Sequence, residues 1–181
     1  MGKPYLSELR LLSDTFDWAR GQDLGSIARA VSASSFLPIL AIGSGGSMAA
    51  ADYLAGLHTS LTGHHSTTHT PLEFLRSNAR MDEFSVWLLS AGGRNVDILR
   101  SARKAIQVEP AHLAIFCASN GSPLAELAAP LAIDLLEYEP PAGKDGFLAT
   151  NSLASFLLLL ARAYSDAIGI SFVSSLPELL V

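Results

Sequence analysis

The sequence predicts an α/β domain in which a parallel β-sheet carries helices on both faces. Short apolar runs alternate along the 181-residue chain with segments whose apolar residues recur every three or four positions, and short turns separate them. Hydrophobic residues make up 49% of the chain and charged residues only 16%. This excess of apolar residues indicates strands buried on both faces, together with a surface that a partner subunit covers.

The expected elements can be placed along the chain. Strands are expected at 37–42, 85–89, 112–117 and 131–136, with one more short strand and a helical turn within 67–75. Helices are expected at 5–33, broken near Gly21, and at 47–60, 96–107, 123–129 and 147–168. We expect the N-terminal helices, 1–34, to pack on a ligand-binding domain of residues 35–168. Residues 169–181 form a tail whose sequence looks like the start of a further domain.

The charge balance and the absence of targeting patterns exclude several classes of protein. With 12 basic and 17 acidic residues the formal net charge is −5, so no basic field attracts nucleic acid or an anionic membrane surface. The start of the chain lacks a signal-peptide pattern, and the apolar segment 147–163 is too short for a membrane span and polar at one end. We therefore expect a cytoplasmic protein. The single cysteine, Cys117, lies in an apolar run and is expected to be a buried, inert thiol.

Three loops rich in serine and glycine follow predicted strands, and each leads into a helix. They are 43–47 (Gly-Ser-Gly-Gly-Ser), 90–95 (Ser-Ala-Gly-Gly-Arg-Asn) and 118–122 (Ala-Ser-Asn-Gly-Ser), named loop 1, loop 2 and loop 3 below. In an open parallel sheet, ligands bind at the carboxyl ends of the strands, and free N–H groups at the start of a helix favour an anion. We interpret the loops as a phosphate site, with ordinary turn formation and helix capping as the alternative.

Three common nucleotide-binding or catalytic motifs do not fit these loops. Loop 1 begins like a dinucleotide-binding motif, but Met48 stands where the third glycine belongs. The Gly-Lys-Ser/Thr of a P-loop does not occur in the chain. The serine of loop 1 is one position away from where a nucleophile elbow requires it.

In order and spacing, the loops resemble the sugar isomerase (SIS) domain family over residues 37–163. Loop 1 is close to the Gly-Asn-Gly-Gly-Ser of sedoheptulose 7-phosphate isomerases, and loop 2 resembles the phosphate-cupping Ser-x-Ser-Gly-x-Thr/Ser. Ser122-Pro-Leu-Ala125, the pair Glu73-Phe74 and segment 146–153 are further matches. The resemblance implies a three-layer α/β/α sandwich around a five-stranded parallel sheet, doubly wound as in flavodoxin, in a homodimer or larger oligomer. It also implies a phosphorylated sugar or amino sugar as the ligand.

Loop 2 departs from the family pattern at two positions. Gly92 stands in place of the second serine and Asn95 in place of the usual Thr or Ser, so two hydroxyl donors are lost, although the amide of Asn95 can still donate. The ligand-binding residues that we expect are Ser44, Gly45, Ser47, Ser90, Gly92, Asn95 and Ser119. The N–H groups of the loops and Ser90 would hold the phosphate, and Ser44 or Ser47 would hold a sugar hydroxyl.

Candidates for catalysis are fewer. Aldose–ketose isomerisation moves a proton between adjacent carbons and needs a base, usually a carboxylate and often with help from histidine. The helix glutamate of the heptose isomerases corresponds to Leu57 here, which leaves Glu73 and His58 as candidates, donated across a subunit interface. Asp145 either stabilises the start of the last helix or contacts the ligand. We expect no cofactor.

A metal site is not expected either. The histidines at 58, 64, 65 and 69 look at first like metal ligands, but no Asp or Glu lies between His58 and Glu73. Three hypotheses about function therefore stay open. The chain is a sugar-phosphate-binding domain that senses its ligand or forms half of an isomerase, an isomerase that is complete only as an oligomer, or a dimerisation module with a degenerate site.

Overall fold

Five parallel strands form the centre of the structure, a computed structural model that describes residues 3–146 and 148–169. The strands are β1 (Ile39–Ile42), β2 (Thr67–His69), β3 (Ser85–Ser90), β4 (His112–Cys117) and β5 (Asp134–Glu137). Their order in the sheet is β2-β1-β3-β4-β5. The chain therefore moves first to one edge of the sheet and then back across it to the other, which confirms the predicted doubly wound topology.

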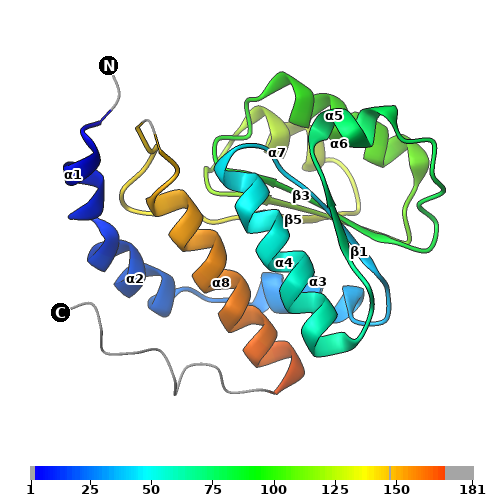
Figure 1. Cartoon of the computed structure of the whole chain (residues 1–181), viewed down its shortest axis with the longest axis horizontal. Helices are drawn as coiled ribbons and strands as arrows, with labels where there is room; N and C mark the ends of the chain where they lie inside the picture. The colour runs from blue at the N-terminus through cyan, green and yellow to red at the C-terminus, as the bar shows by residue number, and fades with distance from the viewer. Residues whose placement is uncertain (1–2, 147, 170–181) are drawn as a thin grey trace.

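Helices cover both faces of this sheet (Figure 1). They are α1 (Tyr5–Leu9), α2 (Leu12–Gly21), α3 (Gly25–Ser34), α4 (Gly46–Thr62), α5 (Pro71–Arg76), α6 (Val96–Val108), α7 (Pro123–Ala128) and α8 (Asn151–Ile168). Helices α3, α4 and α8 pack together on one face, with α2 against α8, and helices α5, α6 and α7 pack on the other (Figure 1). This arrangement is the predicted three-layer α/β/α sandwich.

The two faces of the sheet bury alternate residues of each strand. In β3, all of whose residues are buried, Trp87 and Leu89 belong to the core beneath α4 and α8. Val86 and Leu88 belong to the core beneath α6. Because successive side chains of a strand point to opposite faces, a continuous apolar run is what a strand covered on both sides requires.

Three element boundaries differ from the sequence prediction. The helix predicted at 5–33 has a second break at residues 10–11, where the N–H of Leu11 donates to the carbonyl of Glu8 and closes a tighter turn. The last strand begins at Asp134 rather than at residue 131, because pairing with β4 starts there and residues 129–133 form a turn. The last helix begins at Asn151 rather than at Phe147, which lies outside the described residues, as does the tail at 170–181.

Membrane insertion can be considered from the helices. Within the described part of the chain, none of them combines the length and the apolar character that crossing a bilayer requires.

Candidate functional site

The three serine- and glycine-rich loops lie side by side at the carboxyl ends of neighbouring strands. Loop 2 is joined to loop 1 because the N–H of Ala91 donates to Oγ of Ser47, 3.2 Å away. Loop 2 is joined to loop 3 and α7 by two backbone hydrogen bonds, from Ala118 N–H to the Ser90 carbonyl and from Leu124 N–H to the Gly93 carbonyl. The loops therefore converge, which is the arrangement that a shared anion site requires.

Two of the serines expected to bind ligand hold the loops in place. Oγ of Ser90 accepts the N–H of Gly93 at 3.0 Å, just as Oγ of Ser47 accepts the N–H of Ala91. Both serines are buried, with 8% of their surface exposed. A sequence pattern identifies a hydroxyl but not its hydrogen-bond partner, so this bracing role could not be anticipated from the sequence.

The remaining loop positions are more accessible. Ser44, Gly45, Gly92 and Asn95 are exposed, and Ser119 is half-buried. Asn95 forms the N-cap of α6, since its Oδ1 accepts from the N–H groups of Asp97 and Ile98. Its side-chain amide nitrogen makes no hydrogen bond with any described residue.

Loop 2 presents a set of backbone donors without acceptors. Between the two bonded N–H groups of Ala91 and Gly93 and the capped N–H groups of α6, four N–H groups have no acceptor among the described residues. They are those of Gly92, Arg94, Asn95 and Val96. All four lie at the start of α6, a helix of 13 residues, where the backbone carries partial positive charge. Loop 2 is thus chemically suited to bind an anion.

Comparison with known proteins places this arrangement in a wider group. Scans against protein-family models and curated proteins find no match, whereas solved structures do match. The C-terminal domain of glucosamine-fructose-6-phosphate aminotransferase from Francisella tularensis aligns with a TM-score of 0.72 at 17% identity, over 90% of this chain and 46% of that chain. An E. coli CFT073 protein in complex with arabinose 5-phosphate aligns with a TM-score of 0.67 at 18% identity, over 92% and 95% of the two chains. The Vibrio vulnificus NanR protein complexed with ManNAc-6P aligns with a TM-score of 0.65 at 21% identity, over 91% and 60%. The chain has the sugar isomerase (SIS) fold.

Two carboxylates of this SIS fold occupy other N–H groups near the loops. Asp145 accepts from the N–H groups of Thr150, Asn151 and Ser152, at 3.0 to 3.1 Å. The start of α8 is therefore already neutralised by a charge of the protein itself. Glu137, which sequence reasoning assigned to solvent, accepts the N–H of Gly121 in loop 3 at 2.7 Å. Loop 2 is the part of this edge whose donors remain free.

Glu73, a candidate base, is part of a capping box at the start of α5. Its Oε2 accepts from the N–H and the hydroxyl of Thr70, and its own N–H donates to Oγ1 of Thr70. These hydrogen bonds lower the pKa of the Glu73 carboxyl. The side chain is exposed at the carboxyl edge of the sheet, beside β2, and so lies at the same edge as the loops.

His58, the other candidate, lies at the opposite edge. Helix α4 starts at loop 1 and runs back along the sheet, so its last turns reach the amino ends of the strands. There Nδ1 of His58 contacts the hydroxyl of Tyr164 at 2.7 Å and Nε2 contacts the carbonyl of Leu37 at 3.0 Å. The residue is fully buried. Within this chain His58 therefore joins α4, α8 and the segment before β1, and its contacts favour a structural role.

These contacts predict a specific pH dependence of stability. Burial lowers the pKa of His58, so below about pH 6.5 the unfolded chain takes up a proton that the folded chain does not. Stability present at higher pH is therefore lost as the pH falls from about 6.5 toward the lowered pKa. Urea denaturation at pH 7.5, 6.5 and 5.5 should show this loss, and His58→Gln should show less of it. His65→Gln, at an exposed position, is the matched control. Parallel pH profiles for wild type and His58→Gln would contradict the assignment.

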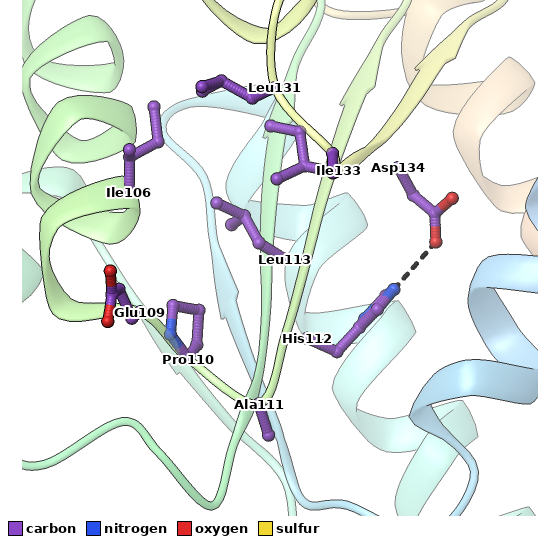
Figure 2. A pocket seen from close by; sticks show the side chains of 10 residues that line it. Ile106, Glu109, Pro110, Ala111, His112, Leu113, Leu131, Ile133 and Asp134 are labelled. Atoms are coloured by element: carbon purple, nitrogen blue, oxygen red, sulfur yellow. Dashed lines mark hydrogen bonds and ion pairs between the residues drawn. The ribbon is translucent and has the colours of Figure 1, made fainter.

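The amino edge of the sheet also carries a cavity of about 450 Å³. Figure 2 shows Ile106, Leu113, Leu131 and Ile133 gathered between α6 and the turn before β5. His112 and Asp134 face away from this apolar group, and their side chains are paired at 2.8 Å. Nδ1 of His112 also contacts the buried Oγ of Ser85 at 2.8 Å. This cavity lies at the edge away from loops 1 to 3 and contains none of the expected site residues.

The remaining sequence expectations concern sulfur and metals. Cys117 is fully buried, and burial raises the pKa of its thiol, as expected for an unreactive cysteine. Among the residues that the structure describes, no three His, Cys, Asp or Glu side chains lie close enough together to hold a metal ion.

Proposed function

We propose that this domain binds a phosphorylated sugar or amino sugar, with the phosphate on loop 2. The observation that carries the proposal is the set of free N–H groups at Gly92, Arg94, Asn95 and Val96, at the positive end of α6. The aligned structures support it, since two of them are complexes with sugar phosphates, ManNAc-6P and arabinose 5-phosphate.

Within this proposal, the residues expected from the sequence take different roles. Gly92 and Asn95 contact the phosphate, whereas Ser90 and Ser47 fix the shape of the loops that surround it. Ser44, Gly45 and Ser119 line the path of the sugar. Ligand binding is the primary function, and isomerase activity is secondary, because His58 is enclosed at the far edge and the Glu73 carboxylate is hydrogen-bonded to Thr70. We also propose that the protein is cytoplasmic and assembles as a homodimer or larger oligomer, which would cover exposed apolar residues near the loops such as Leu72 and Val96.

A thermal-shift assay tests the binding proposal. Arabinose 5-phosphate, ManNAc-6P, glucosamine 6-phosphate and fructose 6-phosphate are each compared with the same sugar without phosphate. A ligand at 100 times its Kd stabilises the folded state by about 2.7 kcal/mol, which raises the Tm of a protein of this size by roughly 5 to 10 °C. If no phosphorylated compound raises the Tm, the binding proposal fails and the dimerisation module is the better interpretation.

A charge variant locates the binding site. A side chain added at Gly92 meets nothing within 4 Å, so Gly92→Asp should fold normally while its carboxylate repels an anion on loop 2. We expect at least about tenfold weaker binding of the sugar phosphate. Gly21→Asp is the matched control, because Gly21 also faces open space, at the end of α2. Equal affinity for the two variants would place the phosphate elsewhere.

A further inference from the structure

One histidine at the ligand edge has a ring nitrogen without a partner. The ionisable groups around the loops are mostly committed to backbone N–H groups: Asp145 at the start of α8, Glu137 at loop 3, and Glu73 at the start of α5. His69 differs. Its Nδ1 is enclosed by protein and makes no hydrogen bond with any described residue. A buried polar atom without a partner is uncommon in folded proteins and calls for an explanation.

His69 directly adjoins the loop edge. It is the last residue of β2, and its carbonyl accepts the N–H of Gly43, the first residue of loop 1. The preceding residue, Thr68, donates to Asp52 of α4. Since neighbouring side chains of a strand alternate, the ring of His69 lies on the other face, toward α5. His69 also acts electrostatically on Glu73, and the residue as a whole is only half-buried.

The distance between His69 and loop 2 fits a monosaccharide phosphate. Strand β1 is the only strand between β2 and β3 in the sheet, so the ends of β2 and β3 are two inter-strand spacings apart, roughly 10 Å. A phosphate on loop 2 leaves the carbon chain of a five- or six-carbon sugar to cross loop 1. Its far end then reaches the end of β2.

We propose that His69 binds the end of the sugar farthest from the phosphate, by a hydrogen bond between its imidazole and a hydroxyl or carbonyl oxygen of the ligand. This inference rests on the proposed function, because it assumes a phosphate on loop 2. It assigns to β2 a recognition role that neither the loop motifs nor the aligned structures indicate. It also explains why no protein group holds the imidazole in one tautomer, since the ligand supplies that partner.

Isothermal titration of wild type, His69→Asn and His65→Asn with arabinose 5-phosphate, ManNAc-6P and inorganic phosphate tests the assignment. Losing one hydrogen bond corresponds to about tenfold weaker binding. We expect that loss for His69→Asn with the sugar phosphate that wild type binds, and unchanged affinity for inorganic phosphate, which reaches only loop 2. His65→Asn, at an exposed position after α4, should bind both as wild type does. In ¹⁵N NMR spectra, the ring nitrogens of His69 should shift with the sugar phosphate and not with inorganic phosphate, a response that a purely structural histidine would not give.

The outcomes separate this inference from the proposed function. If wild type binds neither sugar phosphate, both fail. If wild type binds and His69→Asn binds equally well, the role of His69 is wrong while the phosphate site on loop 2 stands. If His69→Asn weakens inorganic phosphate as much as the sugar phosphate, His69 supports the phosphate site, and its assignment to the far end of the sugar is wrong.

Discussion

Gly46→Ala should lower the free energy of unfolding by about 2 kcal/mol, the middle of the range for overpacking a well-packed site. Gly46 is the first residue of α4, and a Cβ added there would lie 2.0 Å from Cβ of Ala149. Neither methyl group can rotate away, so the segment before α8 has to move. Urea denaturation measures the loss. Gly56→Ala is the control, because Gly56 lies in the same helix in open space and should gain stability from the better helix propensity of alanine.

A second substitution tests whether this one contact causes the effect. In the double variant Gly46→Ala/Ala149→Gly, the methyl group moves from one segment to the other and the packed volume is conserved. We expect the double variant to regain most of the lost stability, with a coupling energy above about 1 kcal/mol. If the two single effects simply add, the close approach of loop 1 to the segment before α8 is not what constrains position 46.

Much of this fold could be predicted from the sequence because it depends on patterns that burial imposes. The apolar runs of β3 and β4 have to be buried on both sides, which only a covered parallel sheet allows. The boundaries were predicted less well for a reason that concerns distant contacts. Apolar Leu131 extended the predicted strand, yet the pairing of β5 with β4 begins at Asp134, and Leu131 lies in the turn before it.

The candidate site shows the same division between local and distant information. Its position could be predicted, since the loops follow the strands in the order that the topology requires. The roles of its side chains could not, because Ser47, Ser90 and Glu137 each accept a hydrogen bond from a neighbouring turn. A serine or glutamate that braces a loop has the same sequence signature as one that contacts a ligand. For His69, the informative feature is an unpartnered ring nitrogen, which only coordinates reveal.

Gly93→Ala should have the largest effect of any single substitution at the loops. Gly93 has a φ of +59°, which costs a residue with a Cβ about 1 kcal/mol. The added Cβ would also lie 2.2 Å from Oγ and 2.5 Å from Cβ of Ser122, and 3.0 Å from Sγ of Cys117. Overpacking of this kind costs roughly 1 to 3 kcal/mol more. We therefore expect a total loss of about 2 to 4 kcal/mol in urea denaturation, and loss of sugar-phosphate binding because loop 2 has to shift away from α7.

Gly121→Ala separates the two causes. Gly121 has a nearly identical φ of +57°, but a Cβ added there meets nothing within 4 Å, so alanine at 121 incurs only the backbone cost. Its N–H, which Glu137 accepts, is kept. We expect Gly121→Ala to lose about 1 kcal/mol and to bind the sugar phosphate as wild type does. If the two variants are equally unstable and both bind, then backbone conformation alone explains the glycine at 93, and the packing of loop 2 against Ser122 does not shape the anion site.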